Sequence, residues 1–500
     1  MSNNQIILGP IIGMVSDKKA KVWFYGSCED DPYCHVFNNT DMEPISGTPF
    51  IFNEVSVSGY EKNGITAKAY VAEVLFPPNM KELTRCLFRI NFSPDPSFED
   101  EKIYSIQQFP SQDEIIKKFS FGLISCNYGY VSTDTNKKNV VEMWANLYNC
   151  MKDNDCKFLI QAGDQVYCDL KGHNAWKKSK EELKKWKKEK DKNKKDEYIQ
   201  NTLNNYRDIY LDSWGFPEVQ HVMQTFPQYM IWDDHEITNG WGSSLDHKNY
   251  SEIFDAARKA YVEFQHSHNP DSLKTGELYY AFSYGPASFL VMDIRGHRDF
   301  YRKQYTIAGK EQWDRIQKWI NSKPVKNSKI LFVVTSVPVL HISRKFGSLG
   351  FIKSDLRDQW STGNNKHERR RLLNMLFDWS GENKRPVFIL GGDVHVGTVI
   401  KLDMMDKEGN PIGKKIDQIT SSPITISPAW FLDFIMAFIT RRFTFHLDDK
   451  KQVLVQSKVR KRFRRRNFGI IEVNLEKERP EVKLNMYKQG KTEPVVVGFK

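Results

Sequence analysis

Hydrophobic and polar residues alternate through the first hundred positions of the chain, and no helical period appears there. Four segments rich in aromatic or β-branched residues are separated by turn signals such as Pro77-Pro78-Asn79. The expected strands are Lys19–Tyr25, Pro49–Ser58, Ile65–Phe76 and Arg85–Phe92. This pattern predicts an all-β immunoglobulin/fibronectin-like sandwich over residues 1–110.

From Phe119 onward, short apolar strands alternate with helical segments. The alternation predicts a layered α/β domain over residues 118–500. One predicted helix shows in the spacing of its apolar residues, Val140, Val141, Trp144, Leu147, Tyr148 and Met151. It would join the strands Phe119–Ile124 and Phe158–Gln161 as a βαβ unit. Two later strands are expected at Gly469–Val473 and Glu481–Tyr487.

Polar residues follow these predicted strands at their carboxyl ends, where open α/β sheets bind ligands. The residues are Ser125-Cys126-Asn127, Gly163-Asp164-Gln165-Val166-Tyr167, Asp233-Asp234-His235-Glu236 with Asn239, Asp293-Ile294-Arg295, Thr335-Ser336, Gly391-Gly392-Asp393-Val394-His395 and Ser421-Ser422-Pro423.

Carboxylate, imidazole, thiol and phenol groups at one edge of a sheet favour a site for two metal ions. Carboxylates suit hard cations, imidazoles suit borderline ones, and thiolate or phenolate stabilises a soft or trivalent ion. A single Asp at a strand end is more often a cap, and a lone buried Cys is usually a packing residue. Because several strand ends carry potential metal ligands, a metal site is preferred over separate capping and packing roles.

Taken together, these motifs resemble the PhoD-like alkaline phosphatase/phosphodiesterase family of the metallophosphoesterases. The general signature of the superfamily reads D-x-H, GD, GNH[DE], H and GHxH. Gly163-Asp164 is similar to the second element, Asp234-His235-Glu236 to the third, and Gly392-Asp393-Val394-His395 to the fifth. Cys126 stands in place of the first element, a replacement typical of the PhoD-like branch. Gly9-Pro10-Ile11-Ile12-Gly13 is similar to the family's opening strand.

The resemblance implies a metallophosphoesterase domain of β-sheets flanked by helices, with a dinuclear or polynuclear metal centre. The implied metal ligands are Cys126, Asp164, Tyr167, Asp234, Asn239, Asp393 and His395. Asp164 would bridge two metals, and Cys126 and Tyr167 would hold Fe3+, with Ca2+ at the neighbouring positions. Another divalent ion such as Mn2+ or Zn2+ is an alternative.

Alternatives stay open at Asp233, Asp234, Tyr167 and Asp169. Asp233 and Asp234 leave a strand on opposite sides, so one can ligate while the other caps. Tyr167 can instead be a packed loop aromatic. The family more often has an acid just beyond this position, and here that ligand is either missing or supplied by Asp169.

Catalytic roles are expected for His235, Arg295 and Asp164. By the resemblance, His235 protonates the leaving oxygen or stabilises charge in the transition state. Arg295 has the geometry to clamp a phosphate oxygen, and a structural ion pair with Asp293 is the alternative. Further candidates for substrate binding are Asn127 and His341. The alternative for His341 is a histidine at the surface or one that hydrogen-bonds to a metal ligand.

Composition excludes a disordered or fibrous protein, because 40% of the 500 residues are hydrophobic and no repeat appears. The net charge of +11 is concentrated in two segments. Lys177–Glu197 has eleven lysines against six acids, and Lys458–Arg466 has seven basic residues and no acid. The first lies in a Lys-rich insertion of about residues 171–200, interpreted as a solvated helical segment in preference to a binding tract. The second is a basic C-terminal segment, 458–466.

The N-terminus lacks the basic and apolar regions of a secretory signal, and the seven cysteines show no CxxC spacing. We therefore expect free thiols and a cytoplasmic location, although export by another route stays open. The apolar segment Trp430–Thr440 is about half the ~20 residues needed to cross a bilayer.

The sequence predicts a metal-dependent phosphoric ester hydrolase, a phosphodiesterase or phosphatase that activates water for in-line attack on a phosphoester substrate. The rival hypothesis is a catalytically degenerate binding protein that takes anionic lipid or nucleic acid through its basic segments. Peripheral contact with an anionic membrane is compatible with either hypothesis. Nucleic acid is the weaker partner, since only Phe463 interleaves the basic run.

Overall fold

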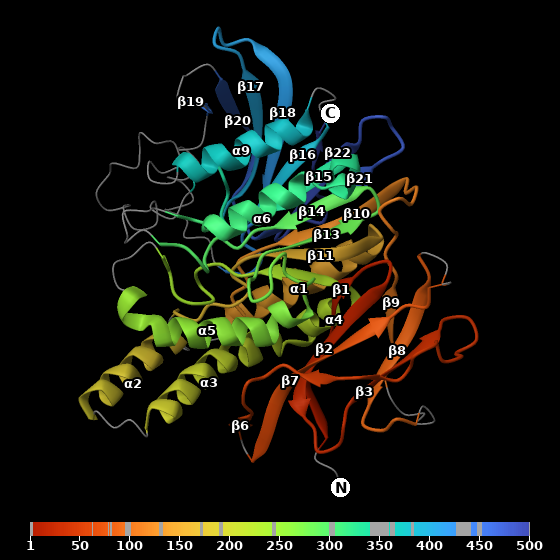
Figure 1. Ribbon diagram of the computed structural model, residues 1–500, viewed down its shortest axis with the longest axis vertical. Helices are drawn as coiled ribbons and strands as arrows, with labels where there is room; N and C mark the ends of the chain where they lie inside the picture. Colours follow the sequence, from red (N-terminus) through yellow and green to blue (C-terminus); the bar gives the residue numbers. More distant parts are fainter. Residues whose placement is uncertain are drawn as a thin grey trace.

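The structure is a computed structural model (Figure 1). It describes residues 4–62, 64–78, 80, 83–95, 102–129, 134–170, 174–189, 194–242, 247–299, 306–340, 360, 366–381, 385–426, 442–447 and 453–499. His341 and the apolar segment Trp430–Thr440 lie outside the described residues, so the predictions made for them stay predictions.

Two antiparallel sheets lie within residues 5–107, with strand orders β1-β2-β7-β5 and β4-β3-β8-β9, and β6 pairs with β7. The strands are β1 Gln5–Val15, β2 Lys19–Ser27, β3 Tyr33–Asn38, β4 Phe50–Ile51, β5 Asn53–Glu54, β6 Tyr60–Lys62, β7 Ile65–Leu75, β8 Arg85–Asn91 and β9 Tyr104–Gln107. The single strand predicted over Pro49–Ser58 is instead two, because the chain passes from one sheet to the other at the buried Phe52.

Two larger mixed sheets follow, and the strands of the predicted βαβ unit pair in parallel. Three further strand pairs are also parallel. The first has the order β12-β11-β10-β21-β22-β23 and the second β13-β14-β15-β16-β18-β17-β20-β19. The first comprises β10 Lys118–Ile124, β11 Cys156–Ala162, β12 Gln228–Ile231, β21 Asn467–Asn474, β22 Glu481–Lys488 and β23 Val495–Phe499. The second comprises β13 Tyr280–Tyr284, β14 Ala287–Val291, β15 Ile330–Val334, β16 Val387–Gly391, β17 Gly397–Met405, β18 Pro411–Thr420, β19 Arg442–His446 and β20 Leu454–Phe463.

The two mixed sheets pack face to face through aromatic side chains. The ring of Phe121 on β10 lies 5.5 Å from Phe289 on β14 and 5.3 Å from Phe332 on β15. The helices are α1 Asp134–Asp153, α2 Ala175–Glu189, α3 Lys195–Trp214, α4 Pro217–Thr225, α5 Ser251–Phe264, α6 Lys310–Ile320, α7 Lys323–Asn327 and α9 Lys366–Ser380. Helices α6 and α9 cover the second sheet in Figure 1 and share a hydrophobic cluster with it. The predicted layering of sheets flanked by helices is confirmed.

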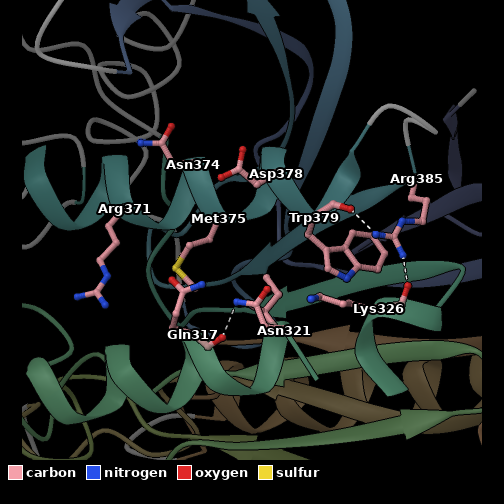
Figure 2. A pocket seen from close by; sticks show the side chains of 10 residues that line it. Gln317, Asn321, Lys326, Arg371, Asn374, Met375, Asp378, Trp379 and Arg385 are labelled. Atoms are coloured by element: carbon pink, nitrogen blue, oxygen red, sulfur yellow. Dashed lines mark hydrogen bonds between the residues drawn. The ribbon is translucent and has the colours of Figure 1, made fainter. Parts of the chain in front are cut away.

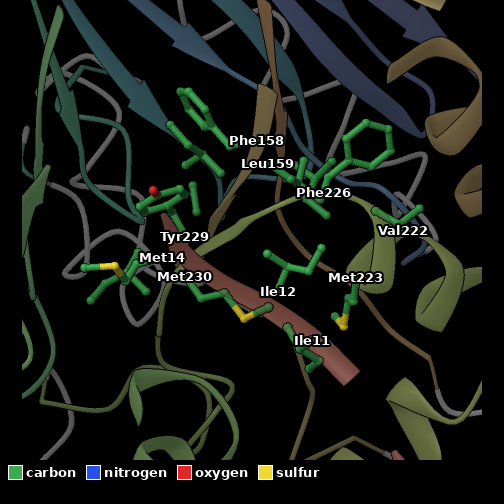
Figure 3. Close-up of a cluster of buried hydrophobic side chains, with 14 of the residues drawn as sticks. Ile11, Ile12, Met14, Phe158, Leu159, Val222, Met223, Phe226, Tyr229 and Met230 are labelled. Atoms are coloured by element: carbon green, nitrogen blue, oxygen red, sulfur yellow. The ribbon is translucent and has the colours of Figure 1, made fainter. Parts of the chain in front are cut away.

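The N-terminal strand β1 is built into the larger layers. Figure 3 shows Ile11, Ile12 and Met14 among side chains of β11, β12 and α4. The hydroxyl of Tyr229 on β12 donates to the carbonyl oxygen of Val15 at 3.0 Å, and Gln224 of α4 donates to Gly9 at 2.9 Å. The N-terminal sheets therefore share one hydrophobic core with the α/β layers.

Two histidines at this junction, His266 partly buried and His268 fully buried, predict a measurable response to acid. His268 lies with its ring 6.0 Å from the ring of Trp23, and burial lowers the pKa of both His266 and His268 to about 3. The unfolded chain binds their protons near pH 6.5, so the stability that each neutral ring contributes is lost as the pH falls from there.

We expect the substitution His268→Gln to change this response. The free energy of unfolding of the variant, relative to wild type, should rise by about 2 kcal/mol between pH 7 and pH 5. Urea unfolding of both proteins at the two pH values measures this difference. A difference that does not change with pH would contradict a neutral buried His268.

Candidate metal centre

The carboxyl ends of the parallel strands in both mixed sheets bring metal-ligating side chains together. Three groups form, and within each the ligand atoms all lie within 4.8 Å of one another. The groups are Cys126 with Asp164 and His395; Asp164 with Asp234 and His235; and Asp164 with Asp233, Asp234 and Asp393. We call these seven residues, with Tyr167, the candidate metal centre. Asp164 belongs to all three groups, as expected of the predicted bridging ligand.

Cys126 and Tyr167 both reach the same oxygen of Asp164. The Cys126 Sγ lies 3.4 Å from Asp164 Oδ2, and the Tyr167 hydroxyl lies 3.3 Å from it. The hydroxyl of Tyr167 is also 3.2 Å from Nε2 of His395. The oxygen of Tyr167 faces the other candidate ligands, which favours its predicted role as a ligand over the alternative of a packed loop aromatic.

Four residues of the centre have left-handed backbone conformations, which non-glycine residues seldom adopt. The φ angles are 59° at Cys126, 55° at Asp164, 60° at Asp393 and 51° at His395. Such conformations are unfavourable by about 1–3 kcal/mol each and persist where the surrounding structure enforces them. Here they turn ligand side chains from successive strand ends toward one another.

The centre gathers more negative groups than its own cations balance. Burial raises the pKa of Asp164 well above its ordinary value, and the charges of Asp233 and Asp234 raise it further. Burial also raises the pKa of Cys126 and of Tyr167, and the neighbouring Asp164 adds to both. A bound cation would reverse each of these shifts by stabilising the ionised groups.

Asp233 and Asp234, which the sequence could not separate, have different partners. The guanidinium of Arg295 donates from Nε to Asp233 and lies 3.5 Å from Asp234. Burial alone would raise the pKa of Asp234, but the Arg295 charge holds it below its ordinary value. Asp234 takes part in two of the three ligand groups and Asp233 in one.

The alternative ion pair of Arg295 with Asp293 is not what the structure has. Asp293 Oδ1 instead accepts the backbone N–H of Arg295 at 2.9 Å and the indole N–H of Trp232 at 2.7 Å. Arg295 is completely buried and balances the aspartates of the centre. A direct clamp on substrate stays a prediction.

His235 is oriented by Asp169, whose carboxylate Oδ1 lies 2.7 Å from His235 Nδ1. The other oxygen of Asp169 accepts the backbone N–H of Asn239 at 2.6 Å. Burial alone would lower the pKa of His235, but the charges of Asp169, Asp234 and Asp164 hold it well above its ordinary value. Asp169, considered from sequence as a replacement metal ligand, orients the histidine. Asn239 is exposed, and its contact here is through the backbone.

Glu236 braces the loops that follow β11 and β12, a role that the sequence did not reveal. Its buried carboxylate accepts the backbone N–H groups of Asp164 at 3.2 Å, Gln165 at 2.7 Å and Asp233 at 2.8 Å. Nε2 of Gln265 donates to it at 3.2 Å. Burial raises the pKa of Glu236 to about 7. The sequence showed Glu236 as part of the Asp-His-Glu motif, but no function was predicted for it.

Ser422 is a second residue that sequence reasoning left without a role. Its hydroxyl lies 3.1 Å from the Cys126 Sγ and accepts the backbone N–H of His395 at 3.0 Å. The predicted strand end at Ser421-Ser422-Pro423 marked the place but not the contact. Ser422 therefore links two candidate ligands from different strands.

Asn127 is held entirely by protein groups. Its side-chain oxygen accepts from Trp144 Nε1 at 3.0 Å and from the Thr425 hydroxyl at 3.1 Å, and its amide donates to the Gln165 carbonyl at 3.3 Å. These contacts make Asn127 a brace between loops. Substrate binding by Asn127, like that by His341, stays a prediction.

The donor set fits metal ions. It combines buried carboxylates with an imidazole, a thiol and a phenol, all drawn from strand ends and aimed at one volume. Hard oxygens suit a divalent cation such as Ca2+ or Mn2+, and the thiol and phenol suit Fe3+ or a softer ion. The chemistry of the donors therefore supports metal binding without specifying the ion.

A surface groove between α6 and α9 is separate from the centre. It encloses about 610 Å³, and Figure 2 shows Gln317 and Asn321 facing Met375 and Trp379 across it. Arg385 stacks on Trp379 at 3.9 Å and donates to the Lys326 carbonyl. No residue of the candidate metal centre lines this groove.

Two solved structures share this architecture. A structure of PhoD superposes with a TM-score of 0.65 at 15% identity and covers 99% of this chain and 89% of that chain. Purple acid phosphatase PPD1 from yellow lupin seeds has a TM-score of 0.58 at 9% identity, covering 98% and 73%. The chain therefore shares the fold of these two phosphatases, with acidic, His and Cys side chains at its strand ends.

The sequence comparison is more specific than the fold. The profile described as PhoD-like phosphatase matches residues 121–484, and the chain belongs to this family. The family resemblance noted from the sequence is confirmed.

Two curated relatives match over shorter stretches. Alkaline phosphatase D of Bacillus subtilis is 27% identical over 216 residues, or 39% of this chain and 35% of that protein. An uncharacterized protein of Saccharomyces cerevisiae is 24% identical over 389 residues, or 62% of this chain and 53% of that protein. The chain thus spans about half of the yeast relative and about a third of the Bacillus one.

Proposed function

We propose that this chain is a metal-dependent phosphoric ester hydrolase, a phosphodiesterase or phosphatase, acting at the candidate metal centre. The observation that carries the proposal is the convergence of Cys126, Asp164, Tyr167 and His395 on one buried point of a PhoD-like fold. Hydrolysis of an aryl phosphodiester and an aryl phosphomonoester by metal-loaded protein tests it. Absence of turnover on both, with metal bound, would contradict it.

Metal ions bound at the centre would lower the pKa of a coordinated water and neutralise charge on the phosphate oxygens. The chain itself supplies positioning and a proton. Because Asp169 occupies Nδ1 of His235, Nε2 is the nitrogen left to meet the substrate. The charge of Asp169 favours the protonated ring of His235, which can donate that proton to the leaving oxygen. The guanidinium of Arg295 balances the negative charge of the Asp233 and Asp234 carboxylates, which it contacts directly.

We infer that Cys126 and Tyr167 would hold Fe3+ and that the neighbouring carboxylates would hold Ca2+, with Mn2+ or Zn2+ as alternatives. A phenolate is a hard anionic ligand that favours a trivalent ion. Protein purified without chelator should then show a broad visible charge-transfer band that disappears in Tyr167→Phe.

Tyr128→Phe is the matched control, since the ring of Tyr128 lies 5.7 Å from that of Tyr167 at the rim of the same centre. The band should survive in this variant. Stoichiometric metal without any band would contradict the ferric assignment while leaving the hydrolase proposal standing.

The N-terminal sheets are proposed to form an immunoglobulin/fibronectin-like sandwich domain, residues 1–110, before a domain spanning 118–500. Their antiparallel pairing supports the sandwich, and the hydrophobic core that they share with the α/β layers packs the two domains together. A cytoplasmic location also stays a prediction. No helix among the described residues has both the length and the apolar character to cross a membrane.

The second candidate function is a binding protein for anionic lipid or nucleic acid. Strand β20 favours it in part, because Lys458, Arg460 and Lys461 are exposed. Phe463 is buried, so the one aromatic residue in the basic segment is not free to stack on a base. Peripheral contact with an anionic membrane is therefore the form of this candidate that we retain.

A further inference from the structure

Helix α2 presents lysine side chains over its whole outer half. Its exposed residues are Lys177, Lys178, Glu181, Lys184, Lys185, Lys187 and Lys188. At 3.6 residues per turn, these positions cover about half of the helix circumference. The exposed face therefore carries six lysines and one acid. Glu182 is partly buried beside Lys178 and Lys185 and offsets only part of that charge.

The inner face of α2 already has its partners. Ala175, Ser179 and Leu183 are buried, and the ring of Trp186 stacks on Tyr198 of α3 with centroids 5.6 Å apart. The helix packs on α3 and α5. Within the described part of the chain, no acidic side chain forms an ion pair with the six exposed lysines. The apolar side of α2 is therefore covered by neighbouring helices, whereas the lysine face stays exposed.

The base of α2 is tied to the candidate metal centre. The backbone N–H of Trp176 donates to Cys168 at 3.0 Å, and Cys168 donates to the carbonyl of His235 at 2.9 Å. Lys180 lies over the rings of Trp176 and Tyr250, at 5.7 and 5.3 Å from their centroids. In Figure 1, α2 and α3 project side by side with their connected ends away from the sheets. The lysine face is thus a projecting ridge that begins beside the centre.

We propose that this lysine face of α2 docks the protein on an anionic membrane surface. A convex ridge of point charges can approach a flat charged surface, whereas single-stranded nucleic acid is bound in grooves with aromatic side chains. The exposed face has no aromatic residue, and it has no Arg, Asn or Gln to read base edges. It also has no apolar residue to insert, so the contact is electrostatic and reversible. The proposal is independent of the hydrolase activity.

The test measures binding to vesicles of phosphatidylcholine, alone and with about 30 mol% phosphatidylserine, in rising salt. Wild-type protein should bind only the anionic vesicles and release from them as salt increases. The variant Lys177→Gln/Lys184→Gln/Lys188→Gln should bind about 100-fold more weakly, since each lysine near such a surface contributes about fivefold. Glutamine is a good helix former, so α2 should remain folded, which circular dichroism checks.

The matched control removes three charges from exposed lysines of α6 and α7, as Lys310→Gln/Lys318→Gln/Lys323→Gln, and should bind like wild type. Four results would overturn the proposal: no binding by wild type, unchanged binding by the α2 variant, equal loss in the control, or tighter binding to duplex DNA than to the anionic vesicles. Loss confined to the α2 variant supports it. Because hydrolysis is assayed separately on a soluble aryl phosphodiester, failure of the docking proposal and failure of the hydrolase proposal are distinguishable.

Discussion

Replacement of Asp164 by alanine is expected to remove metal binding and turnover together. Its carboxylate takes part in all three ligand groups, and its Oδ2 lies within reach of both Cys126 and Tyr167. We expect a loss of at least about 1000-fold in hydrolysis, equivalent to about 4 kcal/mol of transition-state stabilisation. Metal analysis and a phosphodiester assay on the same sample measure both effects.

The Asp164→Ala variant should nevertheless fold. Burial and neighbouring carboxylates disfavour the ionised form of Asp164, so its removal relieves repulsion in metal-free protein. Its urea midpoint without metal should equal or exceed that of wild type. Asp378→Ala, at an exposed position on α9, is the control and should keep both metal and activity. Retained activity in Asp164→Ala would refute a metal centre built on this residue.

Substitution of His235 should separate chemistry from metal binding. Asp169 holds its ring through Nδ1, and the charge of Asp169 favours the protonated form that donates to the leaving oxygen. His235→Asn is expected to lower kcat by about 100- to 10,000-fold while metal content stays near that of wild type. Asp169→Asn should lower kcat less than His235→Asn does. It should also move the alkaline fall in activity to lower pH, because it removes a charge that raises the pKa of His235.

The control for this prediction is His221→Asn on α4, where the histidine is exposed and stacks on Tyr148 at 4.0 Å between ring centroids. It should leave kcat unchanged. Substrates with a good leaving group need less protonation, so the effect of His235→Asn should shrink with p-nitrophenyl esters relative to alkyl esters. An effect on KM alone, with kcat preserved, would assign His235 to substrate binding instead.

Much of the fold could be predicted because the strand signals are local. Apolar runs such as Phe119–Ile124 and Ile330–Val334 end where polar motifs begin, and β10 and β15 end at the same residues. The segment Pro49–Ser58 was harder, since a switch between sheets at Phe52 leaves the alternation of residues unchanged. Local pattern determines that a strand forms, but partner choice depends on distant residues.

The same distinction between local pattern and distant contacts applies to the candidate site. Residue type and strand-end position were sufficient to select Cys126, Asp164 and His395, because parallel strands bring their ends to one edge. The partners of Arg295 and Asp169 could not be predicted, since each contacts residues more than sixty positions away. Sequence proximity suggested Asp293 for Arg295, but a buried guanidinium is positioned by the charges around it in space.

For the Lys-rich insertion, the number of charges in the sequence does not show on which side of the helix they lie. The sequence established eleven lysines over Lys177–Glu197 but could not separate a solvated helix from a binding surface. In the structure, the apolar positions Leu183 and Trp186 turn inward, and the exposed lysines share the opposite side of α2. Because the segment is helical, its exposed lysines lie on one side of α2 and form a single positively charged face.

The measurement that tests the central claim most directly is a metal titration that follows bound metal and phosphodiester hydrolysis in the same samples. Metal-free protein prepared with a chelator should be folded and inactive. Activity should return in proportion to metal bound, reaching a plateau at two or more ions per chain, and Asp164→Ala should show neither. Hydrolysis that persists after complete metal removal would contradict the account, as would full metal occupancy without turnover of any phosphoester.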